Sequence, residues 1–73
     1  MKHNKLKALR VEHGLTQTQM AKLIGIGLTT YNNKENGKLD FNITEIEKIK
    51  KLFHKSYEEI FFRQSAHDTQ HIA

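Results

Sequence analysis

Basic side chains are concentrated in the first half of this chain, where they could bind a polyanion. The chain has 73 residues and a net charge of +4, with histidine counted as neutral. Residues 1–38 contain seven Lys or Arg residues and two Glu residues, a net charge of +5, whereas residues 39–73 carry −1. Such a division favours a partner like nucleic acid for the basic half. Chance asymmetry of solvated charge is the alternative.

The residue types needed for catalysis or metal binding do not occur in suitable combinations. The sequence has no cysteine, so neither a disulfide nor a thiolate zinc site can form. No carboxylate pair, nucleophile with a base, or phosphate-binding loop is apparent, and so short a chain has little core in which to enclose a pocket. His67 and His71 are four residues apart, but a third metal ligand is missing nearby. We expect no enzyme, no cofactor and no metal site.

No segment is suited to a membrane. The longest apolar runs, 23–24 and 60–62, are far too short to span a bilayer. The lysines near the N-terminus are not followed by the apolar stretch of a signal peptide. We therefore expect a cytoplasmic protein with no membrane partner and no small-molecule substrate.

The elements that position these side chains are predicted to be helices, because helix-start signals recur and strand-like alternation is rare. In a capping box, Ser, Thr or Asn at the cap is followed three residues later by Glu or Gln. Thr16, Asn42 and Ser56 each begin such a box. Five short helices are predicted, at about 4–13, 16–24, 28–36, 42–53 and 56–61. They form one domain, 1–62, followed by a polar tail, 63–73, that we expect to be frayed or disordered.

The apolar positions of each helix predict the core. The side chains expected to face inward are Leu6, Leu9, Met20, Leu23, Ile24, Tyr31, Ile43, Ile46, Ile49, Leu52, Phe53, Ile60 and Phe61. The second and third helices are joined by the short turn 25–27, which contains two glycines. Two short helices with a tight glycine-containing turn are typical of a helix-turn-helix, although any helical hairpin could show that outline.

The stretch Leu6–Phe61 resembles the Cro/repressor (Xre-type) helix-turn-helix family of phage and bacterial regulators. The matching pattern is Leu6-x-x-Leu9-Arg10, Gly14-Leu15-Thr16-Gln17, Met20-Ala21, Leu23-x-Gly25-Ile26, Glu35-Asn36-Gly37-Lys38 and Ser56-x-x-Glu59-Ile60. The resemblance covers about three quarters of the chain with its spacing intact. It implies an all-α, compact five-helix bundle of the lambda-repressor-like type. It also implies a sequence-specific, repressor-like regulator that binds double-stranded operator DNA at the nucleoid as a homodimer.

The resemblance also implies roles for individual residues, with the third helix in the major groove. Base contacts are implied for Leu28, Thr29, Asn32 and Asn33. Phosphate contacts are implied for Gln17, Lys34, Asn36, Gly37 and Lys38, including backbone N–H groups of the loop 36–38. The chemistry agrees, because an Asn amide can bind adenine N6 and N7 and a Leu side chain can contact a thymine methyl. The residues alone leave open whether Leu28 belongs to the core, whether Lys34 only packs its stem on the protein, and whether the Asn pair is merely surface.

Four positions bear on how firmly the third helix is held. Arg10 and Glu35 occupy family positions that pair across the first and third helices, and two unpaired surface charges are the alternative. Gly27 stands where the family usually has a capping Ser or Thr, and Lys34 replaces a usual apolar residue. Gly27 therefore predicts a loosely started third helix, and both departures predict that this helix is less rigid before DNA binds.

A protein-interaction module is the alternative function. The same fold could serve as an antitoxin or antirepressor and bind a partner protein through the apolar run 60–62.

Overall fold

The computed structural model describes residues 2–62, which contain five helices and no strand within that range. The helices are α1 (Asn4–Glu12), α2 (Gln17–Ile24), α3 (Leu28–Glu35), α4 (Ile43–Phe53) and α5 (Tyr57–Phe61). The predicted all-α fold is confirmed, and the helix ends agree with the prediction to about one residue. The tail 63–73, with His67 and His71, lies outside the described residues. None of the helices in residues 2–62 has the length and apolar character needed to cross a bilayer.

The three predicted capping boxes are all present. At α2, the Thr16 hydroxyl accepts from the Gln19 backbone N–H at 3.0 Å, and the Gln19 side chain accepts from the Thr16 N–H at 2.8 Å. The same reciprocal pair occurs at the starts of α4 and α5. Each box satisfies donors that a helix start leaves without an intrahelical partner, so these local signals fix where the helices begin.

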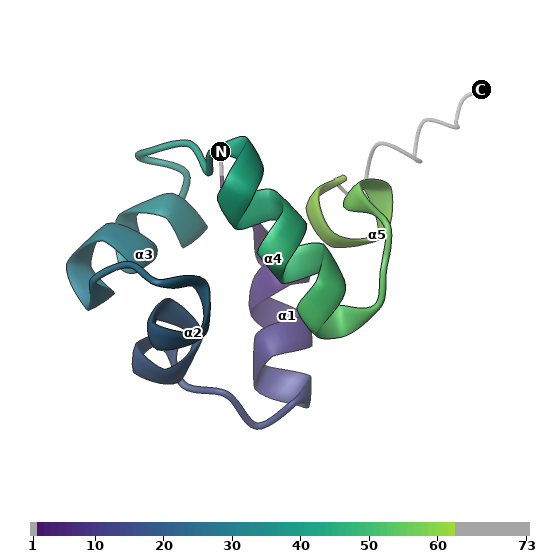
Figure 1. The fold of residues 1–73 in the computed structure, drawn as a ribbon, viewed down its shortest axis with the longest axis horizontal. Helices are drawn as coiled ribbons and strands as arrows, with labels where there is room; N and C mark the ends of the chain where they lie inside the picture. Colours follow the sequence, from purple (N-terminus) through teal and green to yellow (C-terminus); the bar gives the residue numbers. More distant parts are fainter. Residues whose placement is uncertain (1, 63–73) are drawn as a thin grey trace.

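The helices are arranged so that α2 and α3 form one side of the molecule (Figure 1). Helices α1 and α4 lie in the middle, and α5 lies on the opposite side. Helix α3 packs against α2 and α1, while α5 packs against α1 and α4. The α2–turn–α3 unit is therefore supported from one side by α1 and α4.

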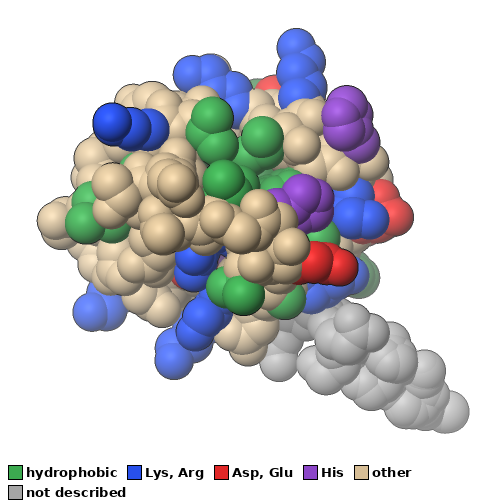
Figure 2. Space-filling model, turned by 90° about the horizontal axis from the view of Figure 1, so that it is seen from below, with side chains coloured by type: hydrophobic (Ala, Val, Ile, Leu, Met, Phe, Trp, Pro, Cys, Tyr) green, Lys and Arg blue, Asp and Glu red, His purple; other side chains and the backbone are tan. Residues whose placement is uncertain are grey.

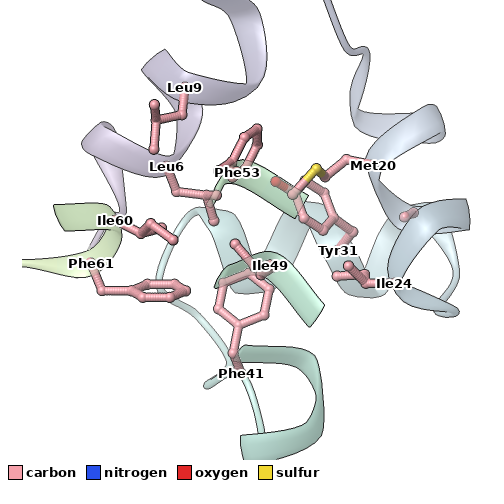
Figure 3. Close-up of a cluster of buried hydrophobic side chains, with 11 residues drawn as sticks. Leu6, Leu9, Met20, Ile24, Tyr31, Phe41, Ile49, Phe53, Ile60 and Phe61 are labelled. Carbon is pink, nitrogen blue, oxygen red and sulfur yellow. The ribbon is translucent and has the colours of Figure 1, made fainter. Parts of the chain in front are cut away.

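The core is built by side chains from all five helices and by Phe41 in the loop before α4 (Figure 3). Its largest fully buried side chains are Tyr31, Leu6, Met20, Ile49 and Ile60. Phe41 links two parts of this core, because its ring centroid lies 6.0 Å from that of Tyr31 and 5.7 Å from that of Phe61. The predicted anchoring of α3 by Tyr31 is thus confirmed.

Two side chains predicted to face inward are exposed instead. Leu23 is 51% exposed and Ile43 is 78% exposed. In α2 the buried residues are Met20, Ala21 and Ile24, which leaves Leu23 beside the buried stripe. In α4 they are Glu45, Ile49 and Phe53, spaced four apart, so that the first helical residue, Ile43, points away from the core. The sequence pattern did not reveal that a carboxylate occupies the buried face of α4.

Substituting His54 by glycine is expected to stabilise the protein by about 0.5–1 kcal/mol. His54 ends α4 in the left-handed conformation, with φ 55° and ψ 45°. A residue with a Cβ pays a steric cost there that glycine avoids, and part of the gain is offset by the greater backbone freedom of glycine in the unfolded chain. Urea unfolding of H54G and of H54A checks this, since alanine keeps the steric cost. Equal stability of the two variants would contradict it.

Candidate nucleic-acid interface

The carboxylate of Glu35 fixes α3 against α1. Arg10 Nε donates to Glu35 Oε2 at 2.9 Å, and Arg10 Nη2 donates to Oε1 at 3.3 Å. Arg10 is 7% exposed and Glu35 is 3% exposed. Arg10 Nη1 also donates to the Leu15 carbonyl at 2.7 Å, which ties the loop before α2 to the same group. The ion pair predicted between Arg10 and Glu35 is present in the structure, and it is buried.

Two further donors, which sequence reasoning missed, complete the surroundings of Glu35. The Tyr31 hydroxyl donates to Oε2 at 2.6 Å, and Gln17 Nε2 donates to Oε1 at 2.9 Å. Burial by itself would raise the pKa of Glu35, but the hydrogen bonds from Arg10, Tyr31 and Gln17 outweigh it and hold that pKa below its ordinary value. Glu35 therefore stays ionised and links α3 to both α1 and α2. Tyr31 lies four residues before Glu35 on the same helix face, and this spacing could have predicted the Tyr31–Glu35 hydrogen bond but not the one from Gln17.

The amides of Gln17 and Asn32 extend this network toward the surface. Asn32 Nδ2 donates to Gln17 Oε1 at 3.1 Å. Asn36 Nδ2 in turn donates to the Asn32 carbonyl at 3.0 Å and to Asn32 Oδ1 at 3.3 Å. Gln17 and Asn32 are both half-buried. Because an amide nitrogen has two hydrogens, each of the two side chains keeps one that these bonds do not use.

The remaining side chains predicted to read bases lie on one face of α3. Leu28 and Asn32 are four residues apart, as are Thr29 and Asn33, and this spacing places them on neighbouring turns of the same face. Leu28 is 47% exposed, so the alternative that it belongs to the core is wrong. Thr29 is exposed and Asn33 is half-buried. Their side chains have no hydrogen-bond partner within residues 2–62, which leaves these groups available to a ligand.

Lys34 does not lie with that face but links α3 to α4. Its ammonium is 2.6 Å from Glu45 Oε1, and the side chains of Lys34 and Glu45 are only 12% and 8% exposed. Glu45 also closes the capping box of α4 by accepting from the Asn42 N–H at 3.0 Å. This geometry corrects the phosphate contact expected for Lys34, because its charge is already paired with a buried carboxylate.

The loop after α3 differs from the prediction in its backbone. The N–H groups of Asn36, Gly37 and Lys38 donate to the carbonyls of Asn32, Lys34 and Asn33, at 3.0, 3.1 and 2.8 Å. Gly37 adopts a φ of 83°, which lets the chain turn back over the end of the helix. The N–H groups expected to meet phosphates are thus engaged in closing α3. Of the contacts predicted for this loop, that of Lys38 remains open, because its exposed side chain has no ion-pair partner within residues 2–62.

Comparison with known proteins identifies the family of the domain to which α3 belongs. A family model described as helix-turn-helix matches residues 6–60. The chain belongs to the Cro/repressor-type helix-turn-helix family. An uncharacterised HTH-type transcriptional regulator of Methanocaldococcus jannaschii is 41% identical to it over 58 residues, which covers 80% of this chain and 88% of that protein.

The helix-turn-helix consists of α2, the turn 25–27 and α3. Gly25 ends α2 with a φ of 82°, and the Ile26 N–H donates to the Ala21 carbonyl at 3.0 Å. Gly27 is the cap of α3 and provides no side-chain hydrogen bond, as its identity predicted. A Cβ at Gly27 would meet nothing within 4 Å, so the position has room for the capping side chain that this member of the family lacks.

The helix-turn-helix also presents backbone donors that sequence reasoning missed. Within residues 2–62 the N–H groups of Gln17 and Thr18 at the start of α2, and those of Leu28 and Thr29 at the start of α3, have no acceptor. The first N–H groups of any helix lack intrahelical partners and lie at the positive end of its dipole. The predicted helix starts were the signal that could have located these donors.

The other titratable groups form no metal site in the part of the chain that the structure describes. No three His, Asp or Glu side chains of residues 2–62 lie together as metal ligands. The positive charge of residues 1–38 is also less concentrated than the sequence suggested. Arg10 and Lys34 are paired with buried carboxylates, and Lys5 lies beside α5 with Lys55 and Glu59.

Proposed function

We propose that this protein is a sequence-specific, repressor-like transcription regulator that binds double-stranded DNA with α3 in the major groove. One observation carries the proposal: α3 presents side chains that are not hydrogen-bonded within residues 2–62, and the same helix is fixed to α1 and α2. Leu28 is exposed and the side chains of Thr29 and Asn33 have no hydrogen-bond partner within residues 2–62, while Glu35 on the same helix is held by donors from α1, α2 and α3. Membership of the helix-turn-helix family and similarity to a relative named as a transcriptional regulator support the same function.

The base-reading roles follow from the chemistry of the exposed face. The Asn33 amide can donate to adenine N7 and accept from adenine N6, and the Thr29 hydroxyl can donate or accept. Leu28 can pack against a thymine methyl. Asn32 is proposed to contact the DNA together with Gln17, since the two amides are hydrogen-bonded and each keeps an unused hydrogen.

The phosphate contacts are proposed at two places beside the groove. The backbone N–H groups of Gln17 and Thr18 lie at the start of α2, where a helix end favours an anion. The Lys38 ammonium projects from the loop after α3, and Asn36 and Gly37 shape that loop. Contacts of this kind position the protein and supply affinity for any sequence, whereas the face of α3 supplies the discrimination.

A homodimer on DNA is part of the proposal. One α3 reads only a short run of base pairs, and two copies would read half-sites about 34 Å apart along the duplex. Exposed apolar side chains, of which Ile43 is the most exposed at 78%, are available for contacts between copies. Bound at an operator, such a dimer would repress by occupying the site, and DNA binding would place the protein at the nucleoid.

The alternative of a protein-interaction module loses most of the surface that suggested it. Of the apolar run 60–62, Ile60 is fully buried and Phe61 is 8% exposed, so only Phe62 is available to a partner. No observation favours an antitoxin or antirepressor over a DNA-binding regulator.

Selection of bound sequences from a random pool of duplexes tests the proposed function. We expect a defined motif to be enriched, and the chain to bind it at least 10³-fold more tightly than an unrelated duplex at the same salt concentration. A pool that stays random after repeated rounds, or a chain that binds all duplexes alike, would overturn the proposal.

Removing the Lys38 charge is expected to weaken binding to all duplexes by a similar factor. In K38A, the slope of log K against log salt concentration should fall in magnitude by about one. The matched control is K55A, because Lys55 lies beside α1 and α5, away from α3. Fluorescence titrations at several salt concentrations measure both slopes. A change confined to one DNA sequence would show that Lys38 reads bases and does not bind phosphate.

A further inference from the structure

A groove between α2 and α4 combines apolar side chains with two lysines. It is lined by Leu23, Ile24, Lys48, Lys51 and Leu52, which we call the α2–α4 groove. Leu23 is 51% exposed, and Leu52 is half-buried against the core. Figure 2 shows apolar side chains gathered on the face seen from below, with Lys and Arg side chains around them.

Within residues 2–62 the charges of the two lysines are only partly balanced, because the carboxylate near Lys48 is Glu45, which is already paired with Lys34. No acidic residue of the described chain lines it. The nearest acidic neighbours along α4 are paired elsewhere, since Glu45 binds Lys34 and Glu47 binds Lys50. Lys48 Nζ lies 3.4 Å from the Ile24 carbonyl, and the exposed Lys51 has no partner within residues 2–62. The groove therefore suits an occupant with an apolar side chain flanked by a carboxylate.

The exposed surface of α5 has that composition. Tyr57 is 47% exposed and Phe62 is 54% exposed. Glu58 is also exposed and has no partner within residues 2–62. Phe62 directly follows the last residue of α5, and its N–H donates to the Glu58 carbonyl at 3.1 Å, so the two residues are close together. We call Tyr57, Glu58 and Phe62 the α5 patch. It offers two aromatic rings and a free carboxylate, which complement the leucines and lysines of the groove.

We propose that the α5 patch of one copy of this chain docks in the α2–α4 groove of a second copy. Phe62 and Tyr57 would cover Leu23 and Leu52, and Glu58 would meet Lys51 and Lys48. Helices α2 and α5 lie on opposite sides of the molecule (Figure 1), so one copy cannot bring its own patch to its own groove. The contact is head-to-tail, and it can link successive copies in a row.

Duplex DNA is a poorer occupant of the same groove. A phosphate backbone would pair with the lysines but would leave Leu23 and Leu52 exposed to water. The groove also uses none of the residues proposed to contact DNA. Self-association through it is therefore separable from the proposed function and can be measured without DNA. A surface this small predicts weak association, with a dissociation constant on the order of 0.1–1 mM.

The experiment follows amide shifts of the full chain by NMR as its concentration rises to the millimolar range, together with sedimentation. We expect shifts at the α2–α4 groove and at the α5 patch. K51E and E58K, each alone, should weaken association about threefold or more. An equimolar mixture of the two variants should associate more strongly than either variant alone, in pairs, because E58K keeps an intact groove for the intact patch of K51E. K50E is the matched control, since Lys50 pairs with Glu47 outside the groove.

Three results would overturn the proposal. The first is the absence of shifts at the groove and the patch up to millimolar concentration. The second is a mixture of K51E and E58K that associates no better than either variant alone. The third is a K50E chain that is impaired as much as K51E, which would indicate a general charge effect. Retained self-association in a chain that fails to bind DNA would leave this proposal standing and refute only the proposed function.

Discussion

Replacing Glu35 by alanine is expected to lower the free energy of unfolding by about 3–5 kcal/mol, the largest loss we predict for a single substitution. The change strands the charge of Arg10, which is 7% exposed, and removes the acceptor that Tyr31 and Gln17 also use. An uncompensated buried charge and unsatisfied buried donors both destabilise a folded protein. Because α3 is the helix that these bonds hold, its amide protons should lose hydrogen-exchange protection before those of α1.

Urea unfolding at neutral pH measures the loss. The matched control is E47A, because the Glu47 side chain is 55% exposed and its pair with Lys50 is worth little, about 0–1 kcal/mol. A loss below 1 kcal/mol for E35A, comparable with that of E47A, would show that the buried network does not hold the fold together.

The same network predicts an acid-dependent part of the stability. The pKa of Glu35 is lower in the folded protein than its ordinary value of 4.5. Its contribution is therefore fully present above about pH 4.5 and is lost as the pH falls through the folded pKa. E35Q lacks this group, so the difference in stability between the original chain and E35Q should shrink below pH 4.5. A difference that is constant with pH would contradict the assigned direction of the shift.

Replacing Asn33 by alanine is expected to cost about 1–3 kcal/mol on the duplex selected from the random pool, or roughly 5- to 150-fold in affinity. The amide of Asn33 has no partner within residues 2–62, so its loss should leave the fold unchanged. The loss should also be specific. The preference at one base pair of each half-site should relax, while the preferences at the other positions remain.

Titrations of the selected duplex and of its single base-pair substitutions measure this. Substituting 7-deazaadenine for the contacted adenine should weaken the original chain but should have little further effect on N33A, since both changes remove the same hydrogen bond. The matched control is N4A, at the exposed start of α1. Equal weakening of N33A on every duplex would mean that Asn33 does not read a base.

The parts of the fold that could be predicted from sequence are those determined locally. The boxes that begin at Thr16, Asn42 and Ser56 need only residues three apart, and each one located a helix start correctly. Tyr31 was predicted to face inward from a mostly polar helix, and it is fully buried.

The parts that could not be predicted depend on how one helix is rotated against another. Leu23 and Ile43 extend apolar stripes in the sequence, yet both are exposed, because tertiary packing decides which edge of a stripe is covered. Glu45 is buried in place of an apolar residue, and its burial is compensated by Lys34 from α3 together with the Asn42 N–H of the capping box. A charge pair between residues eleven positions apart leaves no periodic signal in the chain.

The candidate site was predictable in outline and not in its hydrogen bonds. The resemblance placed Leu28, Thr29 and Asn33 on the recognition helix, and the structure exposes a face there. It could not show that the backbone N–H groups of residues 36–38 are consumed in closing α3. The backbone conformation at the end of α3 decides which N–H groups remain for a ligand. Residue identities do not specify that conformation.

Intermolecular NOEs in the complex with the selected duplex test most directly whether the exposed face of α3 reads base pairs from the major groove. We expect the methyl protons of Leu28 and Thr29 to show NOEs to thymine methyl and cytosine H5 protons, which lie in that groove. NOEs from α3 only to sugar protons or to adenine H2 in the minor groove, or no NOEs from α3 while another surface contacts the DNA, would contradict the central claim.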